Sequence, residues 1–463
     1  MNNRRALVLA TAALAGSTAI LDTSIVNLAL PAIGKAFGTD ASGLAWAVNA
    51  YVLPFAVSIL AAGRLGDAFG RRRVLAAGGV MFAIGSAGCA LAGSYAALLA
   101  MRAVQGLGGS LLMTVSLATV SATFDEATRP KALGIYFASG ATAGAAGPII
   151  GGVLTDLFGW EAMFSMQVPL SLAVTGAALA FLDRPAEARR PNLDLPGLGL
   201  ATVMLGGVNF AILQANDRGW TSPVIVSSWL LAIAALALFI VRERTAAAPA
   251  VRLEVFRNRR FVASSLVGAA AWFALLSGTI QVAVYLQEGR GLNPTQSSLV
   301  ILAWPLAALV VFLKSSGVVR RFGSQPTMFV ALGISVLFAA MMPFFGEGTP
   351  LPVVSAIAAA GGAAIALSVT ASTVCAVAEF PPSEAGIASG IFNSLRQVGS
   401  ALGVAIPAAA YDAATGGSLG GTAAFNGSAW AFGSRLAVLA LLLVVVAAVL
   451  PRLRPAIPER AAA

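Results

Sequence analysis

Residues 63–75 read Gly-Arg-Leu-Gly-Asp-Ala-Phe-Gly-Arg-Arg-Arg-Val-Leu, a short glycine-rich segment that carries one acid and four arginines. Apolar runs near 44–63 and 74–93 flank this segment, and each approaches the roughly 20 residues that a helix needs to cross a bilayer. Charged side chains are rare inside membrane spans. We therefore expect residues 63–75 to form a tight, glycine-dependent turn between two membrane-spanning helices.

The composition of the whole chain indicates the same class. Of 463 residues, 58% are hydrophobic and only 10% are charged, and the mean hydropathy is +0.86. Soluble domains carry about 25% charged residues, so an all-α integral membrane protein is predicted. The 49 glycines suit close helix–helix packing in lipid.

Apolar runs of spanning length recur along the chain. Fourteen transmembrane helices are predicted, near 6–31, 44–63, 74–93, 96–122, 132–156, 162–182, 195–214, 223–241, 261–286, 296–315, 326–345, 352–378, 386–410 and 430–450.

The basic residues predict the orientation. With the N-terminus in the cytoplasm, the opposite side receives only four of the 29 Lys and Arg, namely Lys35, Arg218, Arg290 and Arg435. Arg102 and Arg396 fall inside helices, and all other basic residues fall on the cytoplasmic side. Both termini are therefore expected in the cytoplasm, and the net charge of +10 needs no nucleic-acid partner, because it follows from membrane topology.

An internal repeat predicts the domain organisation. Residues 131–151 align with 383–403 at an offset of 252, and 63–70 align more weakly with 316–323. The offset exceeds six helices by about the length of two helices with their loops. We expect two six-helix bundles, residues 1–190 and 251–463, with a helix pair inserted at 191–250. Parallel repeats of this kind place a substrate site at their interface near the midplane.

Two charged residues in mid-span are the strongest chemical signal. Asp22 lies within the first apolar run and Arg102 within the fourth. An unpaired carboxylate at the bilayer centre costs at least about 2.5–3.5 kcal/mol, so it is rarely kept without a use. Counted at 1.5 Å per residue, both residues reach a similar depth. We expect the pair to couple proton binding to transport; the alternative is a static ion pair that locks two helices.

Other chemistries lack candidate residues. The chain has no histidine, and Cys89 and Cys375 both lie in apolar runs, so neither a metal site nor a disulfide framework is expected. No phosphate-binding G-x-x-x-x-G-K-[ST] motif occurs. We therefore expect no cofactor beyond the proton gradient, and a membrane enzyme is poorly supported.

Several motifs resemble those of the major facilitator superfamily. Residues 63–75 resemble its signature between helices 2 and 3, 102–106 (Arg-Ala-Val-Gln-Gly) its helix-4 motif, and 144–152 (Gly-Ala-Ala-Gly-Pro-Ile-Ile-Gly-Gly) its antiporter motif. The runs 21–31, 159–169 and 396–403 resemble its fourteen-helix drug:proton antiporter subfamily. Ala68, Glu161 and Gln167 depart from the family pattern.

The resemblance implies roles for the first motif. In the family its acid, here Asp67, faces the cytoplasmic start of the helix equivalent to 386–410, where Pro382-Ser383 is a candidate N-cap. Gly63, Asp67, Gly70, Arg71 and Arg72 are therefore expected to gate the cytoplasmic side. The arginines, with Arg73, would meet Glu379 and Glu384; alternatively they only set topology.

The motif at 144–152 predicts a smooth, kinkable helix face. Gly147, Pro148, Gly151 and Gly152 would pack closely against the other bundle and take part in its movement. A role in packing alone is the alternative.

Six residues are candidates for the substrate cavity, namely Gln105, Met113, Trp272, Asn393, Arg396 and Gln397. Arg396 lacks an obvious carboxylate partner. It is expected either to bind an anionic or polar substrate group or to donate to backbone carbonyls.

The function expected from these features is proton-coupled efflux of small hydrophobic or amphiphilic compounds by alternating access. Exporters of one metabolite or lipid and a non-transporting membrane sensor are the alternatives. A monomer in the cell membrane is expected, with the small molecule, protons and lipid as its partners. With Asp22 as the one mid-span acid, neutral, monocationic or amphiphilic substrates are expected rather than dications.

Overall fold

A computed structural model describes residues 3–39, 41–183, 194–246, 251, 253–292, 294–380, 385–415 and 421–449, and every regular element in these ranges is helical. The helices are α1 (Asn3–Phe37), α2 (Ala41–Phe69), α3 (Arg71–Ala90), α4 (Tyr95–Thr123), α5 (Arg129–Phe158), α6 (Glu161–Phe181), α7 (Leu195–Arg218), α8 (Pro223–Thr245), α9 (Arg259–Val284), α10 (Pro294–Ile301), α11 (Ala303–Phe322), α12 (Ser324–Met341), α13 (Leu351–Ala378), α14 (Ala385–Thr415) and α15 (Gly421–Val449). The 3₁₀ helices η1 (Leu253–Arg257) and η3 (Met342–Phe344) and the π-helical segment η2 (Tyr285–Gly289) complete them.

Among the described residues, thirteen helical segments are long and apolar enough to cross a membrane. The expected span 386–410 lies within α14, which is not among the thirteen, so the count of fourteen stays a prediction. α10 and α11 share one span, Gln296–Phe322, where the sequence predicted a continuous helix. The break follows Ile301, because Pro305 has no N–H to donate to the carbonyl four residues earlier.

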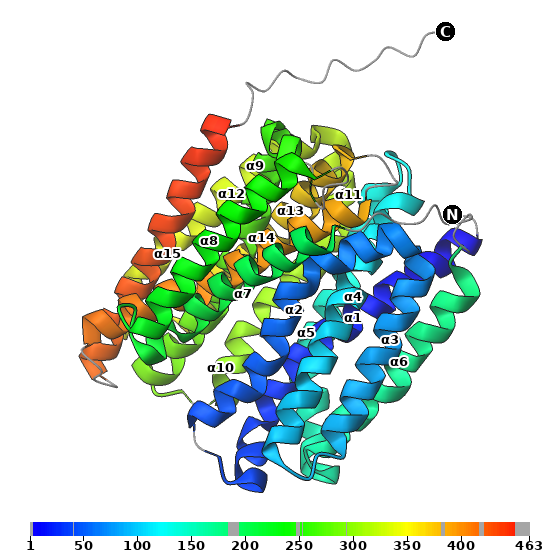
Figure 1. The fold of residues 1–463 in the computed structure, drawn as a ribbon. Coiled ribbons are helices and arrows are strands. Elements are labelled where there is room, and N and C mark those ends of the chain that lie inside the picture. The colour runs from blue at the N-terminus through cyan, green and yellow to red at the C-terminus, as the bar shows by residue number, and fades with distance from the viewer. Residues whose placement is uncertain are drawn as a thin grey trace.

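The helices form two bundles that lie side by side (Figure 1). α1 to α6 make up one and α9 to α15 the other, and we call them the N-bundle and the C-bundle. α7 packs against α8 and also against one helix from each bundle, α2 and α14. Each bundle buries its own apolar interior, with Phe82 and Leu112 in the N-bundle and Leu332 and Leu439 in the C-bundle.

One end of the molecule is identified by ion pairs within the N-bundle. Arg4 pairs with Asp183 just past the end of α6, and Arg5 lies 3.4 Å from Asp125 after α4. We call this end, where α1 begins, the N-terminal face. α2, α4 and α6 end there, and α3 and α5 begin there.

The bundles contact each other mainly through two helix pairs, α2 with α14 and α5 with α11, and less extensively through α4 with α14 and α5 with α13. In the sequence repeat, α2 corresponds to α11 and α5 corresponds to α14. The contact of α2 with α14 is therefore the counterpart of the contact of α11 with α5. Gly134 of α5 faces the carbonyl of Phe312, as Gly386 of α14 faces that of Gly63. This arrangement fits a pseudo-twofold axis between the bundles.

The segment 63–75 is largely helical, and the expected glycine-dependent turn is confined to one residue. Residues 63–69 belong to α2, and α3 begins at Arg71. Gly70 alone connects them, with φ 88°. Helices α5 and α11 likewise end in Phe-Gly, with Gly159 at φ 85° and Gly323 at φ 82°. Glycine adopts this left-handed conformation without steric cost, so one residue reverses the chain.

Candidate functional site

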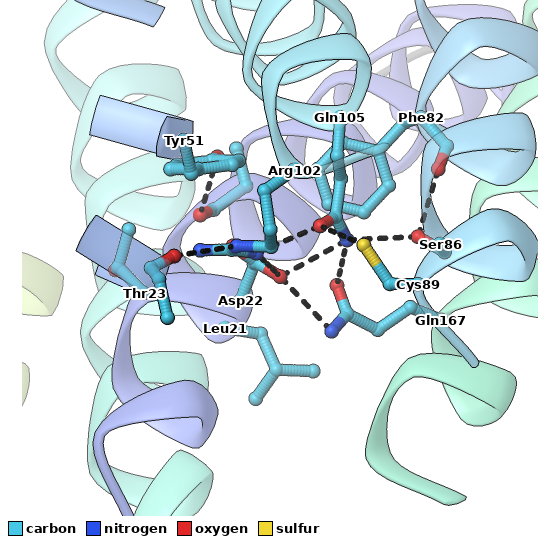
Figure 2. Close-up of polar contacts among 12 residues, drawn as sticks. Leu21, Asp22, Thr23, Tyr51, Phe82, Ser86, Cys89, Arg102, Gln105 and Gln167 are labelled. Atoms are coloured by element: carbon cyan, nitrogen blue, oxygen red, sulfur yellow. Dashed lines mark hydrogen bonds and ion pairs between the residues drawn. The ribbon is translucent and has the colours of Figure 1, made fainter. Parts of the chain in front are cut away.

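Asp22 is completely buried inside the N-bundle and lies against Arg102 (Figure 2). Arg102 NH1 donates to Asp22 Oδ1 at 3.0 Å and to Oδ2 at 2.8 Å. Gln105 Nε2 and Gln167 Nε2 also donate to Oδ1, at 3.0 and 3.1 Å. The carboxylate therefore has one charged and two amide donors, the kind of set that makes a buried ion tolerable.

Arg102 is held in place on its other sides. Its Nε donates to the carbonyl of Ala47 at 3.2 Å, and its NH1 donates to Gln105 Oε1 at 2.7 Å. Its guanidinium lies 4.5 Å from the ring centroid of Tyr51 and 5.7 Å from that of Phe164. These contacts do not involve Asp22, so the arginine keeps partners when the carboxylate is neutralised.

Two members of this site were not assigned from the sequence. Gln167 on α6 was noted only as a departure from the family pattern, and Ser86 on α3 carried no signal. Ser86 Oγ accepts from Gln105 Nε2 at 2.8 Å. We call Asp22, Ser86, Arg102, Gln105 and Gln167 the Asp22 cluster; it joins α1, α3, α4 and α6. Gln105, expected at the substrate cavity, belongs to this cluster instead.

Asp67 connects the two bundles at the N-terminal face. Its Oδ1 and Oδ2 accept from the backbone N–H groups of Gly386 and Ile387, each at 2.9 Å. These N–H groups lie in the first turn of α14, where a helix favours negative charge. The expected cap, Pro382-Ser383, lies outside the described residues. The structure thus caps α14 with a carboxylate from the other bundle.

Glycine permits the close approach beside this cap. A Cβ on Gly63 would overlap the carbonyl of Gly386, and a Cβ on Gly386 would overlap that of Gly63. Gly390 lies one turn further along the same crossing, against Ile59 and Leu60. Gly63 therefore serves the contact between α2 and α14 rather than a turn.

Within the described part of the chain, Arg71 and Arg72 have partners other than the expected Glu379. Arg71 NH2 lies 3.4 Å from Asp67 Oδ1, and Arg72 NH2 donates to the carbonyl of Leu179 at 2.6 Å. Glu379 accepts from Asn258 Nδ2 at 2.5 Å. The expected pairs with Glu379 are corrected accordingly, while Glu384 lies outside the described residues and Arg73 is exposed.

Gly147 and Gly151 of α5 pack within the N-bundle, which corrects the expectation that they face the C-bundle. A Cβ on Gly147 would overlap Ser24 Oγ, and one on Gly151 would lie 3.1 Å from the carbonyl of Ile25. Gly152 has open space around its Cβ position, and α5 continues through Pro148. The contact with α11 falls instead at Gly134, which no motif singled out.

A cavity of about 630 Å³ lies between the bundles. Its lining is mostly apolar and comes from Gly16, Ile20, Met113, Tyr136, Phe137, Gly140, Ala141, Gly144, Ala145, Ile149, Trp272, Leu275, Thr279, Ser298, Leu299, Ile301, Leu302, Trp304, Pro305, Ala308, Phe312, Ile365, Val369 and Arg396. No residue of α7 or α8 is among them.

The cavity is closed toward the N-terminal face. The rings of Phe137 and Phe312 meet there across the bundles, with centroids 5.7 Å apart. Ile149 and Leu299, further toward the opposite face, are exposed. The volume is in the range of small-molecule sites, about 300–1,000 Å³.

Three of the six residues expected at the cavity line it, namely Met113, Trp272 and Arg396. Asn393 lies behind Arg396 and accepts from its NH1 at 3.1 Å. Gln397 is not among the lining residues. Asp22 is not among them either, so the buried acid and the cavity are separate sites.

Arg435 is a third buried arginine, which corrects its expected place on the outer side. α15 begins at Gly421, well before the expected start, and this puts Arg435 inside the span Phe425–Val449 at 2% exposure. Its NH1 donates to Met342 Sδ at 2.6 Å and its NH2 to the carbonyl of Ala274 at 3.3 Å.

Comparison with known proteins agrees with this architecture. A family model described as Major Facilitator Superfamily matches residues 12–404. The chain is 33% identical over 408 residues to the multidrug resistance protein Stp of Mycobacterium tuberculosis, covering 88% of this chain and 76% of that protein. It is 31% identical over 402 residues to the methylenomycin A resistance protein of Bacillus subtilis, covering 86% of each. The tetracenomycin C resistance and export protein of Streptomyces glaucescens is 32% identical over 389 residues, covering 83% of this chain and 72% of that one.

Solved structures show the same fold at low identity. The human organic anion transporter MFSD10 matches with a TM-score of 0.70 at 17% identity, covering 96% of this chain and 100% of that one. The proton:xylose symporter XylE matches with a TM-score of 0.66 at 16% identity, covering 95% of each chain. At these identities the likeness concerns the fold alone.

Proposed function

Because the chain belongs to the Major Facilitator Superfamily, we propose that it is a proton-coupled secondary exporter of small hydrophobic or amphiphilic compounds, working by alternating access. The relatives named for multidrug resistance, methylenomycin A resistance, and tetracenomycin C resistance and export support drug-like cargo. The observation that carries proton coupling is the completely buried Asp22 in ion-pair contact with Arg102.

The orientation is part of the proposal. The N-terminal face carries Arg4, Arg5 and the run Arg71–Arg73, and the bias of basic residues supports a cytoplasmic position for this face. The protein would then lie in the cell membrane as a monomer with both termini inside. In this orientation the molecule would be closed on the cytoplasmic side and its cavity would lie toward the opposite side, which corresponds to an outward-facing conformation.

Protonation of Asp22 is the proposed coupling step. A neutral carboxyl no longer balances the charge of Arg102, and the attraction between α1 and α4 weakens. Arg102 still contacts the carbonyl of Ala47 and the ring of Tyr51. These contacts would hold its side chain when it moves away from Asp22. The proton stays on the carboxyl oxygen of Asp22 until the Asp22 cluster becomes accessible from the opposite side of the membrane.

A continuous set of contacts connects this step to the cavity. Ser24 and Ile25 follow Asp22 on α1 and pack against Gly147 and Gly151 of α5. α5 in turn carries Gly134 and Phe137, which meet Phe312 of the C-bundle. A displacement of α1 would therefore be transmitted through closely packed backbone to Phe137 and Phe312, which line the cavity. Transmitting this movement is the proposed role of Gly147 and Gly151.

A dedicated exporter of a single compound is the second candidate. Two of the relatives are named after one antibiotic each, methylenomycin A and tetracenomycin C. The coupling step is the same in both cases, so a susceptibility panel with and without the protein separates them by the number of compounds affected. A narrow response identifies the dedicated exporter.

The test is Asp22→Asn, which keeps the side-chain volume and one acceptor oxygen but cannot titrate. We expect it to abolish gradient-driven efflux and protection of cells, while exchange of labelled for unlabelled substrate in proteoliposomes without a gradient continues. Asp125→Asn, which alters an exposed acid, is the matched control and should behave as the parent. Full gradient-driven efflux by Asp22→Asn would overturn the proposal.

A further inference from the structure

We infer that the cavity contains a recognition site for an organic anion, built on Arg396, and that the preferred cargo is an apolar aromatic compound with one carboxylate or equivalent acceptor group. This inference rests on the proposed export function and specifies its substrate class. It is based on hydrogen-bond donors of the cavity wall that have no acceptor in the described part of the chain.

Arg396 is a buried cation without an anionic partner among the described residues. It is 2% exposed and lines the cavity. Its guanidinium stacks over Trp272, 4.4 Å from the ring centroid, with Phe392 and Phe137 at 5.6 and 5.7 Å. NH1 donates to Asn393 Oδ1, while Nε donates to no described atom. Cation–π contacts orient the group but leave its donors open.

Three further buried polar groups near Arg396 are donors without an acceptor among the described residues. The indole N–H groups of Trp272 and Trp304 are buried without an acceptor in the described part of the chain, and so is Asn393 Nδ2 behind them. Trp272 and Trp304 line the cavity with Arg396. Buried donors without acceptors destabilise a protein. A ligand that brings an acceptor to these donors would form hydrogen bonds that the described residues do not supply.

The acceptor is best supplied by a planar anion. A guanidinium matches a carboxylate in planar geometry and charge, and the bond is charge-assisted. The described lining of the cavity contains neither Asp nor Glu, so a cation would enter it without a counter-charge. The remaining lining, including Leu275, Ala308 and Ile365, suits an apolar body.

Arg435 shows that burial alone does not make such a site. It is as buried as Arg396, and its Nε likewise has no described acceptor, but its NH1 and NH2 donate to Met342 and Ala274, and it is not a lining residue. Arg435→Gln is therefore a burial-matched control for the loss of a cation.

An anionic cargo has an electrical consequence. If one proton enters for each monoanion that leaves, two positive charges move inward per cycle, against one for a neutral cargo. Export of the anion is then driven by the membrane potential as well as by the pH gradient. A neutral analogue should respond less to an imposed potential.

The experiment compares 2-naphthoate with its neutral isostere 2-naphthamide. Binding to the purified full chain in lipid nanodiscs is measured by calorimetry. We expect the parent to prefer naphthoate, and Arg396→Gln to weaken naphthoate binding about tenfold or more, as expected for a hydrogen-bonded charge, with amide binding little changed. Arg435→Gln should preserve the ratio of the two affinities.

Equal or tighter binding of the amide by the parent, or an equal loss of both ligands in Arg396→Gln, would overturn the inference. Should Arg396→Gln fail to fold, Trp272→Phe removes one donor and keeps an aromatic ring. Its naphthoate-to-amide ratio should fall, and an unchanged ratio counts against the site. Binding needs no proton gradient, so these outcomes are independent of the Asp22→Asn test for export.

Discussion

Replacing Asp67 by Ala should open the N-terminal face. The carboxylate accepts from two backbone N–H groups of α14 at 2.9 Å each, and its side chain is 9% exposed. Both bonds cross between the bundles, so they exist only in the closed arrangement. Their loss therefore destabilises that arrangement selectively rather than the fold of either bundle.

The magnitude follows from the bonds. A hydrogen bond to a charged group contributes about 1.5–3 kcal/mol, so two of them contribute at least about 3 kcal/mol. At 1.4 kcal/mol per factor of ten, Asp67→Ala should shift the closed-to-open ratio roughly a hundredfold. Asp67→Asn keeps one acceptor and loses the charge, so an intermediate shift of about tenfold is expected.

The assay is a distance measurement between spin labels by double electron–electron resonance. Labels at Arg73 on α3 and Arg320 on α11 are exposed and lie on different bundles at the N-terminal face. The native Cys89 and Cys375, both buried, are replaced first. We expect a longer-distance population to appear in Asp67→Ala.

Asp125→Ala is the matched control for this measurement. Asp125 lies at the same face but accepts from Thr128 N at 3.0 Å and Thr128 Oγ1 at 2.6 Å, and pairs with Arg5, all within the N-bundle. These hydrogen bonds from Thr128 lower the pKa of Asp125 and stabilise a local turn only. If Asp67→Ala and the parent give the same distances, the carboxylate does not hold the bundles closed.

Two further substitutions test neighbouring contacts. Gly386→Ala places a methyl group against the carbonyl of Gly63, so it should open the same face even with Asp67 present, and the same spin labels measure it; unchanged distances would show that α14 can shift without opening. Gln105→Leu removes one donor to Asp22 and one to Ser86, so the protonated carboxyl forms more easily. The pH of half-maximal efflux in proteoliposomes should then move to higher values, and an unmoved profile would argue against Asp22 as the proton carrier.

Counting helix rise was sufficient to bring Asp22 and Arg102 to one level, because membrane helices run nearly straight between the two surfaces and the depth of a residue follows from its sequence position. The segment 63–75 identified the contact of Asp67 with α14 only through the family resemblance. The sequence repeat was informative for the same geometric reason, since the Phe-Gly ends of α2 and α11 recur in the structure at equal places.

Other features depend on helix rotation and length, which the sequence does not encode locally. The α5 glycines form a smooth face, but its partner depends on how α5 is turned, and that partner is α1. Arg435 was misplaced because the Gly- and Ala-rich start of α15 resembles a loop in composition. The donors gathered around Arg396 come from α9, α11 and α14, so only the assembled bundles bring them together.

The position of Asp22 relative to the cavity constrains the coupling. Ile20 lines the cavity, and two residues along a helix turn the side chain by about 200°. Asp22 therefore points into the N-bundle, toward Arg102 and Gln167, while Ile20 and Gly16 point to the cargo. In the proposed mechanism, proton and cargo therefore do not compete for one group, and coupling passes through the movement of α1. A cargo of any charge can then be exchanged for the same proton, provided that its binding permits the movement of α1. The preference for a charged cargo depends instead on Arg396 of the C-bundle.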